Sequence, residues 1–434
     1  MGRASGVAGD PVGQRHPRHV HAMEFIHNAH PIRVGGDFIQ SVNARVTANE
    51  LCARSTRRHE LGNRAMLKRP FGEAGRRCDM CGRNPLGTGS SGLAALLETE
   101  AARFTLQTPD DTAPVQAVEF ERLRERKPLG VGIYVKHLTT GEEAGVQPDV
   151  VFEAQSVIKL AIAIRSYKLA DDGQLDLDER IRLTRSDYVG GTGLLHYFQE
   201  GLEPTLRDLL TAMIVASDNS AVDPLLARIG GVADLNAWLA ASGYPKARMV
   251  QTMLDCSRFP YVLADAQHAS LTGAEAYALQ NDHPQWADMT QNQFESIKRE
   301  VAALAARPVG ELRALARQLG LPLAFGHLTP RVTGRMLESI ERATAVSRTS
   351  SVELQTALRR QQLGYRRLPH FIDYPIGHKT GDYPPLDAND VGIIYSPSGP
   401  IVVAVFANDL GGDYEEEEDR IGRIGRLVVD HFEA

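Results

Sequence analysis

The strand-like segments of this 434-residue chain fall into two groups near opposite ends of its folded part. Residues 131–138 read as a strand that ends at a hairpin turn over 139–142, and three further strands are expected at 375–381, 391–396 and 401–407. A long helical pattern separates the two groups. Because these strands can bury their apolar faces only together, the chain is predicted to be an α+β protein. It should contain a five-stranded antiparallel sheet, with an all-α lobe inserted between the two halves of that sheet.

Helices are expected on both sides of the strands in sequence. Residues 93–104 are apolar at helical spacing, and a closing amphipathic helix is indicated by Ile421, Ile424, Leu427, Val428 and Phe432. The acidic run 413–419 lies where this last helix starts, which a favourable interaction with the helix dipole explains. We therefore expect N- and C-terminal helices to flank the sheet.

The helical middle carries two strong local signals. Residues 157–163 are apolar on all sides apart from Lys159, which indicates a helix buried in the middle of the domain. Thr205 followed by Asp208 is typical of a capping box and predicts a helix that runs to about Ala216.

The first 92 residues differ in composition from the rest of the chain. They contain fourteen Lys and Arg and seven Asp and Glu, which gives a formal charge of +7. Because the whole chain carries −6, residues 93–434 carry −13. They show no sustained periodicity and end in a Gly/Ser-rich stretch. We predict a mostly disordered basic extension over 1–92 and one folded domain over 93–434. Within that domain we assign an α/β part to 93–155 and 370–434, and a helical part to 156–369 with an insertion near 254–327.

Charge, hydropathy and cysteine usage limit the partners to expect. A net charge of −6 gives no reason to expect nucleic acid, and no apolar run is as long as a membrane span. Cys78 and Cys81 form one CxxC, with Cys52 and His59 as distant candidates for completing a zinc site, but the sequence lacks a second close pair. We therefore expect no metal, no cofactor and a monomer. The first thirty residues show no secretory signal pattern, and the sequence does not indicate a cellular compartment.

Ser156-Val157-Ile158-Lys159 places a hydroxyl and an amine one helical turn apart. On one helix face the amine can take the proton of the hydroxyl, and the helix start favours negative charge developing at Ser156. By itself the motif is weak, because a chain of this length should show about one SxxK by chance.

Two further short motifs follow in the chain. Ser217-Asp218-Asn219 comes directly after the capped helix and is expected on a loop, where it offers a hydroxyl and an amide to a cleft. Lys379-Thr380-Gly381 closes a strand, and its glycine would let a substrate backbone approach closely. Three such elements in this order are a far rarer coincidence than any one of them.

With these motifs the chain resembles class A serine β-lactamases and the related penicillin-binding DD-peptidases, over about residues 93–253 and 328–434. Further matching segments are Gly190-Gly191-Thr192-Gly193, Ile229-Gly230-Gly231 and Leu328-Thr329-Pro330. The resemblance implies a β-lactamase/transpeptidase-like fold and acylation of a serine.

The resemblance also implies catalytic roles for three residues. Ser156 would be acylated, Lys159 would deprotonate it, and Ser217 would relay a proton to the leaving nitrogen.

Substrate-binding roles follow from the same resemblance. Asn219 would bind the side-chain amide of the substrate, and Lys379 with Thr380, beside Gly381, would hold its carboxylate. The backbone N–H groups of Ser156 and Asp382 would form the oxyanion hole.

The chain departs from the class A pattern at the deacylation step. Class A enzymes activate water with the glutamate of an ExxLN motif, and this chain has no ExxLN. Counting without gaps from Gly231 places Met253 where that glutamate is expected. Ser217 and Lys379 are 162 residues apart. That spacing is about sixty residues longer than the family pattern, and the extra residues look helical over 294–306 and 312–319.

An acid from this insertion could replace the missing glutamate. Asp255, two positions after Met253, is the candidate deacylation base, and Glu275 and Glu295 are alternatives. His378 could also be proposed, although a strand histidine beside Lys379 is more simply a packed or solvated neighbour.

The leading prediction is a serine hydrolase that acts through a Ser156 acyl-enzyme on β-lactam or related amide bonds of a small-molecule substrate. The alternatives are a DD-peptidase, penicillin-binding or esterase-like relative with slow deacylation, and a non-catalytic binding protein on the same fold.

Overall fold

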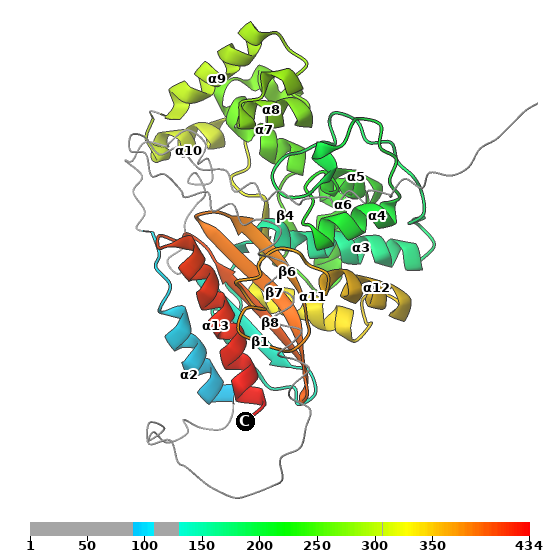
Figure 1. Ribbon diagram of the computed structural model, residues 1–434, viewed down its shortest axis with the longest axis vertical. Helices are drawn as coiled ribbons and strands as arrows, with labels where there is room; N and C mark the ends of the chain where they lie inside the picture. The colour runs from blue at the N-terminus through cyan, green and yellow to red at the C-terminus, as the bar shows by residue number, and fades with distance from the viewer. Residues whose placement is uncertain (1–89, 108–129, 306) are drawn as a thin grey trace, which may run out of the picture. The chain divides into compact units, whose positions relative to one another are not determined.

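The central sheet of the computed structural model joins the two ends of the folded chain (Figure 1). The structure describes residues 90–107, 130–305 and 307–434. The strands follow the order β2-β1-β8-β7-β6, and every neighbouring pair is antiparallel. Their bounds are β1 Val131–His137, β2 Glu143–Val146, β6 Ile376–Tyr383, β7 Asp387–Ser396 and β8 Gly399–Ala407.

The pairing of β1 with β8 closes the sheet. It runs without interruption from Val131 opposite Ala407 to His137 opposite Ile401. The last seven residues of β8 are buried, so both of its faces are covered. A strand buried on both faces reads as a continuous apolar run, which is why 401–407 could be recognised as a strand from sequence.

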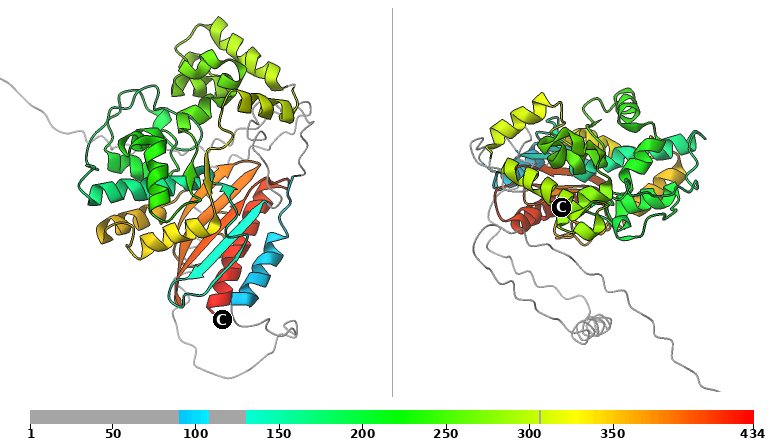
Figure 2. Two further views of the ribbon diagram at one scale, coloured as in Figure 1. Left: turned by 180° about the vertical axis from the view of Figure 1, so that it is seen from behind. Right: turned by 90° about the horizontal axis from the view of Figure 1, so that it is seen from above.

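Two terminal helices cover one face of the sheet. Helices α2 (Ser90–Ala101) and α13 (Tyr414–Phe432) lie side by side in both figures and contact each other (Figures 1 and 2). Buried side chains of these two helices pack in one apolar cluster with the residues of β1 and β8 that face them. The Asp413 side chain accepts a hydrogen bond from the Glu416 backbone N–H and caps α13. The prediction of an α+β fold, with an antiparallel five-stranded sheet flanked by N- and C-terminal helices, is confirmed.

The opposite face of the sheet carries the helical lobe. Helix α11 (Pro330–Glu341) packs on β1 and β8, and α12 (Arg348–Leu358) packs against β6. The predicted capping box is present, because Thr205 and Asp208 each accept a hydrogen bond from the backbone N–H of the other. The other lobe helices are α3 Lys159–Asp171, α4 Leu206–Val215, α5 Val222–Arg228 and α6 Gly231–Ala241.

A second, small sheet was not predicted. It has the order β3-β5-β4, with bounds Phe152–Glu153, Gly326–Leu328 and Arg248–Met249. The buried Glu153 carboxylate accepts hydrogen bonds from the backbone N–H groups of Phe325 and Gly326, at 3.0 and 3.1 Å. Strands of two or three residues are too short to show a period, so they cannot be recognised from periodicity.

The insertion folds as helices around cores of its own. Helices α7 (Met253–Ala264), α8 (Gly273–Asn281), α9 (Gln291–Ala305) and α10 (Val309–Gln318) enclose two apolar clusters distinct from the main core. One cluster contains Phe259 and Leu312, and the other contains Phe294 and Leu279. The predicted helical segments 294–306 and 312–319 correspond to α9 and α10, which begin slightly earlier than expected.

The candidate zinc ligands Cys52, His59, Cys78 and Cys81 lie outside the described residues. Helix α2 begins at Ser90, so the last three residues assigned to the N-terminal extension are helical. Within the described ranges, no helix is long and apolar enough to cross a bilayer, and no cluster of His, Cys, Asp and Glu is arranged to hold a metal ion.

We predict that Phe294→Ala unfolds the insertion without unfolding the sheet. Phe294 is fully buried in a cluster separate from the main core, and truncating such a ring typically costs about 3–5 kcal/mol. Hydrogen exchange should show lost protection in α8 and α9 and unchanged protection in β7 and β8. Ile162→Ala, in the main core, is the matched control and should weaken protection of the lobe and the sheet together.

Candidate functional site

Ser156 lies in a tight turn directly before helix α3. The 3₁₀ turn spans Gln155–Ile158, and Lys159 is the first residue of α3. Side chains three residues apart eclipse each other in a 3₁₀ turn, so Ser156 and Lys159 project from the same side. Ser156 is partly exposed, whereas the other residues of the turn are buried. The sequence placed the pair on a regular α-helix, so the 3₁₀ geometry is a difference from expectation.

The turn is held in an unfavourable backbone conformation. Gln155 has φ of 46°, a region that residues other than glycine rarely adopt. Its side-chain amide donates a hydrogen bond to Asp387 Oδ2 at 2.7 Å in the buried interior. Strained backbone of this kind is typical of functional sites, where the surrounding structure fixes the geometry.

Strand β6 runs close against this turn because Gly381 has no side chain. A Cβ atom at Gly381 would lie 2.6 Å from the Ala154 carbonyl oxygen and 3.0 Å from the Val157 nitrogen. The first distance is shorter than packing allows and the second is tight, so glycine lets the strand approach this closely. Gly381 thereby brings the Lys379-Thr380-Gly381 segment beside Ser156.

The Lys159 side chain is completely buried and reaches the Ser217-Asp218-Asn219 loop. Its Nζ lies 2.6 Å from the Ser217 carbonyl oxygen, 2.7 Å from Asn219 Oδ1 and 3.3 Å from Ser217 Oγ. Burial, together with the positive charge of Lys379, holds the pKa of Lys159 well below its usual range. A neutral amine can donate to the two carbonyl oxygens and keep its lone pair for a hydroxyl proton.

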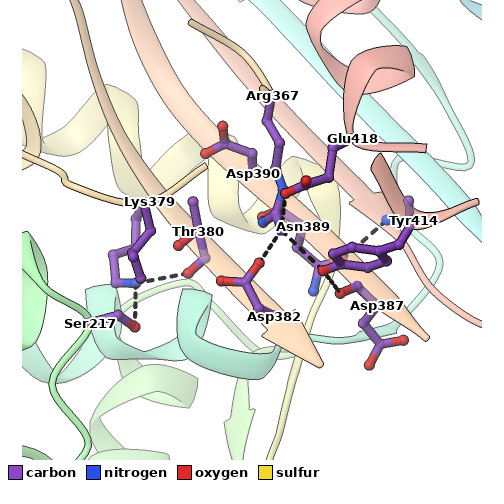
Figure 3. A network of polar contacts seen from close by, with 12 residues as sticks. Ser217, Arg367, Lys379, Thr380, Asp382, Asp387, Asn389, Asp390, Tyr414 and Glu418 are labelled. Carbon is purple, nitrogen blue, oxygen red and sulfur yellow. Dashed lines mark hydrogen bonds and ion pairs between the residues drawn. The ribbon is translucent and has the colours of Figure 1, made fainter. Parts of the chain in front are cut away.

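The Lys379 side chain meets the same serine from the sheet (Figure 3). Its Nζ donates to Ser217 Oγ at 2.9 Å and to the Thr380 carbonyl at 2.8 Å. Burial lowers the pKa of Lys379 to about 7. The Ser217 hydroxyl therefore lies between two buried amines from different parts of the fold.

The loop that carries Ser217 is bound to the segment 189–195. The Asp218 carboxylate accepts hydrogen bonds from the backbone N–H groups of Leu194 and Leu195, at 2.6 and 2.9 Å. The Asn219 amide donates to the Gly190 carbonyl at 2.8 Å. The predicted loop after α4 is present, and its residues are fixed on both sides.

A buried ion-pair network supports the end of β6 (Figure 3). The Arg367 guanidinium is buried, pairs with Asp382, and contacts Glu418 at 2.9 Å. It also donates to the Asn389 carbonyl at 2.9 Å. Sequence reasoning missed Arg367, because nothing in its neighbourhood marks it as the partner of an acid fifteen residues away on a strand.

Thr380 and His378 share the other face of β6, since successive strand residues alternate. Thr380 is fully buried, and its hydroxyl has no hydrogen-bond partner within the described part of the chain. His378 is buried with its Nδ1 2.9 Å from Asp390 Oδ1, so it is a packed neighbour rather than a free base.

The structure places Asp255 at the first turn of α7, away from these contacts. Its side chain is 57% exposed and lies 4.0 Å from Arg258, and its backbone N–H donates to Thr252 Oγ1. The alternative acids are Glu275, which forms the capping box of α8, and Glu295, which is exposed on α9.

Asp223 is the acid that contacts the Met253 segment. Its two carboxylate oxygens accept the backbone N–H groups of Met253 and Leu254, each at 2.8 Å. Burial raises the pKa of Asp223 to about 6. Sequence reasoning missed it, although it stands only four residues after Asn219.

Comparison with known families identifies the family of this chain. A model described as the beta-lactamase enzyme family matches residues 116–432. This chain belongs to that family. Members with similar sequences include β-lactamase L2 of Stenotrophomonas maltophilia, 27% identical over 154 residues, or 36% of this chain and 50% of L2. β-Lactamase VEB-1 of Pseudomonas aeruginosa is 26% identical over 143 residues, or 32% of this chain and 48% of VEB-1.

The chain thus spans about half the length of these two curated family members. The extended-spectrum β-lactamase PER-1 of Pseudomonas aeruginosa is matched over 327 residues at 22% identity, which is 73% of this chain and 87% of PER-1.

Solved structures show the family fold. A β-lactamase of Sphaerobacter thermophilus superposes with a TM-score of 0.53 at 23% identity, over 80% of this chain and 98% of the other. An ancestral class A β-lactamase gives 0.54 at 21% identity, over 78% and 99%. A PBP-A variant described as an acyl-enzyme complex with penicillin G gives 0.51 at 21% identity, over 73% and 95%.

We predict that the folded state disfavours the charged form of Lys379, so that the free energy of unfolding depends on pH. Because its folded pKa is depressed, its contribution to stability is full above the unfolded pKa and is lost as pH falls toward about 7. The free energy of unfolding of the wild type, relative to Lys379→Met, should therefore drop by on the order of 2–3 kcal/mol between pH 9.5 and 7. Urea unfolding at both pH values measures the difference. A pH-independent difference would show that Lys379 titrates normally.

Proposed function

We propose that this protein opens β-lactam or related amide bonds through an acyl-enzyme on Ser156. The observation that carries the proposal is the position of the Ser217 hydroxyl, 3.3 Å from the Lys159 amine and 2.9 Å from the Lys379 amine. Two buried amines and a hydroxyl in one chain of contacts provide a path for protons beside a partly exposed serine.

Lys159 would act as the base for acylation. Its lowered pKa favours the neutral amine, which can take the Ser156 proton as Oγ bonds to the carbonyl carbon of the substrate. When the carbon–nitrogen bond breaks, the same proton would pass through Ser217 to the leaving nitrogen. The backbone N–H groups of Ser156 and Asp382 would bind the oxyanion.

Substrate binding would use the other side chains of the cleft. Lys379, charged below a pH of about 7 and stabilised in that form by an anion, would hold a substrate carboxylate. The Thr380 side chain lies on the other face of β6, so Thr380 would contribute there only through its backbone. Asn219 would contact the side-chain amide of the substrate, positioned by its own contact with Gly190. Asp382 is held by Arg367, which keeps the oxyanion-binding end of β6 rigid.

A second candidate function differs only in the fate of the acyl-enzyme. Met253 stands where a class A glutamate would be expected, and Asp255 is largely exposed. Without a positioned base the acyl group would persist, so the protein would be a penicillin binder or a peptidase with slow turnover. The PBP-A structure, described as an acyl-enzyme with penicillin G, is a precedent on this fold.

The first test is mass spectrometry after mixing the protein with benzylpenicillin. A transient adduct on Ser156 supports a β-lactamase, and a stable adduct supports the penicillin binder. We expect Ser156→Ala to abolish the adduct with little loss of stability. An adduct that survives this change would falsify the choice of nucleophile.

Lys159→Ala should slow acylation by roughly 10²-fold or more, because the base is lost. Lys168→Ala is the matched control, since Lys168 lies on the same helix but pairs with Asp172 at the surface. Stopped-flow measurement of adduct formation compares the two. Equal rates in the two variants would remove Lys159 from the mechanism.

Met253→Glu should shorten the lifetime of the acyl-enzyme by roughly 10²-fold, the usual contribution of a positioned general base. Met253→Leu keeps the apolar side chain and is the control. We expect Asp255→Asn to leave turnover unchanged, because its carboxylate is exposed. Slower deacylation in Asp255→Asn would instead establish Asp255 as the base.

A further inference from the structure

The two N–H groups assigned to the oxyanion lie on segments that are far apart in the sequence. One belongs to Ser156 in the turn Gln155–Ile158, and the other belongs to Asp382 near the end of β6. An oxyanion hole works only when both donors lie about 2.7–3.1 Å from the position that the oxyanion will occupy. The spacing between the turn and the strand end must therefore be fixed by contacts between them.

Packing limits how closely the turn and β6 approach each other. A Cβ atom at Gly381 would lie 2.9 Å from Val157 Cγ2 and 2.6 Å from the Ala154 carbonyl oxygen, so the strand backbone is already in contact with the turn. A contact of this kind opposes closer approach, whereas each pair of atoms in it attracts only weakly. Another interaction is needed to keep the two segments from separating.

The hydrogen bond from Gln155 to Asp387 joins the same two segments. Gln155 Nε2 donates to Asp387 Oδ2 at 2.7 Å, and both side chains are buried. Gln155 directly precedes Ser156. Asp387 is the first residue of β7 and lies opposite Tyr383, and the next residue of β7 lies opposite Asp382. The hydrogen bond therefore runs from the neighbour of one oxyanion donor to the hairpin that carries the other.

The Asp387 end of this hydrogen bond is held by other parts of the fold. Its backbone carbonyl accepts a hydrogen bond from the Tyr414 hydroxyl of α13 at 2.7 Å (Figure 3), and its Oδ1 accepts the Asp409 backbone N–H at 3.4 Å. A hydrogen bond to a carboxylate is roughly twice as strong as one between neutral groups, and burial excludes the water that would compete for it. Asp387 is thus a fixed and strong acceptor.

The Gln155 end carries the strained backbone of the turn. Its φ of 46° is a conformation that a glutamine keeps only when the surrounding structure imposes it. The hydrogen bond to Asp387 helps to impose it, because it fixes the direction of the Gln155 side chain relative to the sheet. Without this bond the turn could relax, and the Ser156 N–H would move with it, because that N–H belongs to the peptide unit directly after Gln155.

We propose that the Gln155–Asp387 hydrogen bond sets the spacing between the two oxyanion-binding N–H groups, and that both residues are positioning residues for acylation. The inference rests on the proposed function, which assigns the oxyanion to the backbone of Ser156 and Asp382. Both side chains act through the backbone rather than through contact with the substrate. Because the oxyanion forms only in the transition state, losing the hydrogen bond should slow the acylation step and leave substrate binding unchanged.

The test separates binding from acylation in stopped-flow measurements with benzylpenicillin. Gln155→Met keeps the length of the side chain and removes the donor. It should lower the maximal acylation rate by roughly 10²-fold, with the half-saturating concentration of benzylpenicillin unchanged. The double variant Gln155→Glu with Asp387→Asn reverses the direction of the hydrogen bond and keeps the total charge, so it should recover most of the rate.

Two outcomes of these rate measurements would overturn the inference. One is an acylation rate of Gln155→Met equal to that of the wild type. The other is a double variant as slow as Gln155→Met, because the loss would then not come from the hydrogen bond.

Gln355→Met is the matched control. Gln355 is 7% exposed and Gln155 is 6% exposed, and the Gln355 amide also donates in the interior, to the Ile340 carbonyl at 3.3 Å between α12 and α11. This variant removes a buried amide of the same kind away from the oxyanion donors, so it should acylate at the wild-type rate. A similar loss of rate in Gln355→Met would show a general effect of removing a buried amide and would count against the inference.

Hydrogen exchange tests the positioning without any substrate. The Val157 N–H donates to the Ala154 carbonyl at 3.0 Å and closes the turn that presents Ser156. Its exchange, read by NMR, should be about tenfold faster in Gln155→Met and should return toward the wild-type rate in the double variant. Unchanged exchange in Gln155→Met would overturn the inference.

The two measurements distinguish this inference from the proposed function. A wild type that forms no adduct with benzylpenicillin would defeat the proposed function, while faster exchange in Gln155→Met that the double variant reverses would still support the role of the hydrogen bond in fixing the turn. Equal acylation by the wild type and Gln155→Met would defeat this inference alone.

Discussion

Two lysine amines are buried within reach of one serine hydroxyl, and most of the local structure serves to make that arrangement stable. Lys159 and Lys379 are both completely inaccessible to solvent. The free-energy cost of burying an amine falls when the amine is neutral or has hydrogen-bond acceptors. Both amines here have a lowered pKa and hydrogen-bond acceptors. The acceptors are carbonyl oxygens of Ser217, Asn219 and Thr380. These contacts tie the first lobe helix, the loop after α4 and the strand β6 to one another.

Three carboxylates raise the pKa of Lys159 through their charge, without a hydrogen bond to its amine. The negative charges of Asp218, Asp382 and Asp223 favour the charged form of Lys159, while burial and Lys379 oppose it. Each of these carboxylates is itself fixed, by backbone N–H groups at Asp218 and Asp223 and by Arg367 at Asp382. Their charge therefore acts on the site from defined positions rather than from mobile side chains.

The sheet, its flanking helices and the three motifs could be predicted because each leaves a periodic or fixed-spacing signal. The buried run 401–407 and the capping box at Thr205 are local patterns. The contacts that bring the three motifs together are tertiary contacts between segments far apart in the sequence. The φ of 46° at Gln155 and the close approach of Gly381 depend on tertiary packing, and neither leaves a pattern in the sequence. Arg367 and Asp223 were missed for the same reason, since their partners come from distant segments.

Two contacts join the insertion and its first residue to segments next to the site. Asp223 fixes the backbone at Met253, where a deacylating acid would be expected, and Tyr277 packs on Gly190 beside Asn219. By contrast, the contacts among Lys159, Ser217 and Lys379 involve no atom of residues 254–327. The proposed acylation step therefore depends on contacts outside the insertion.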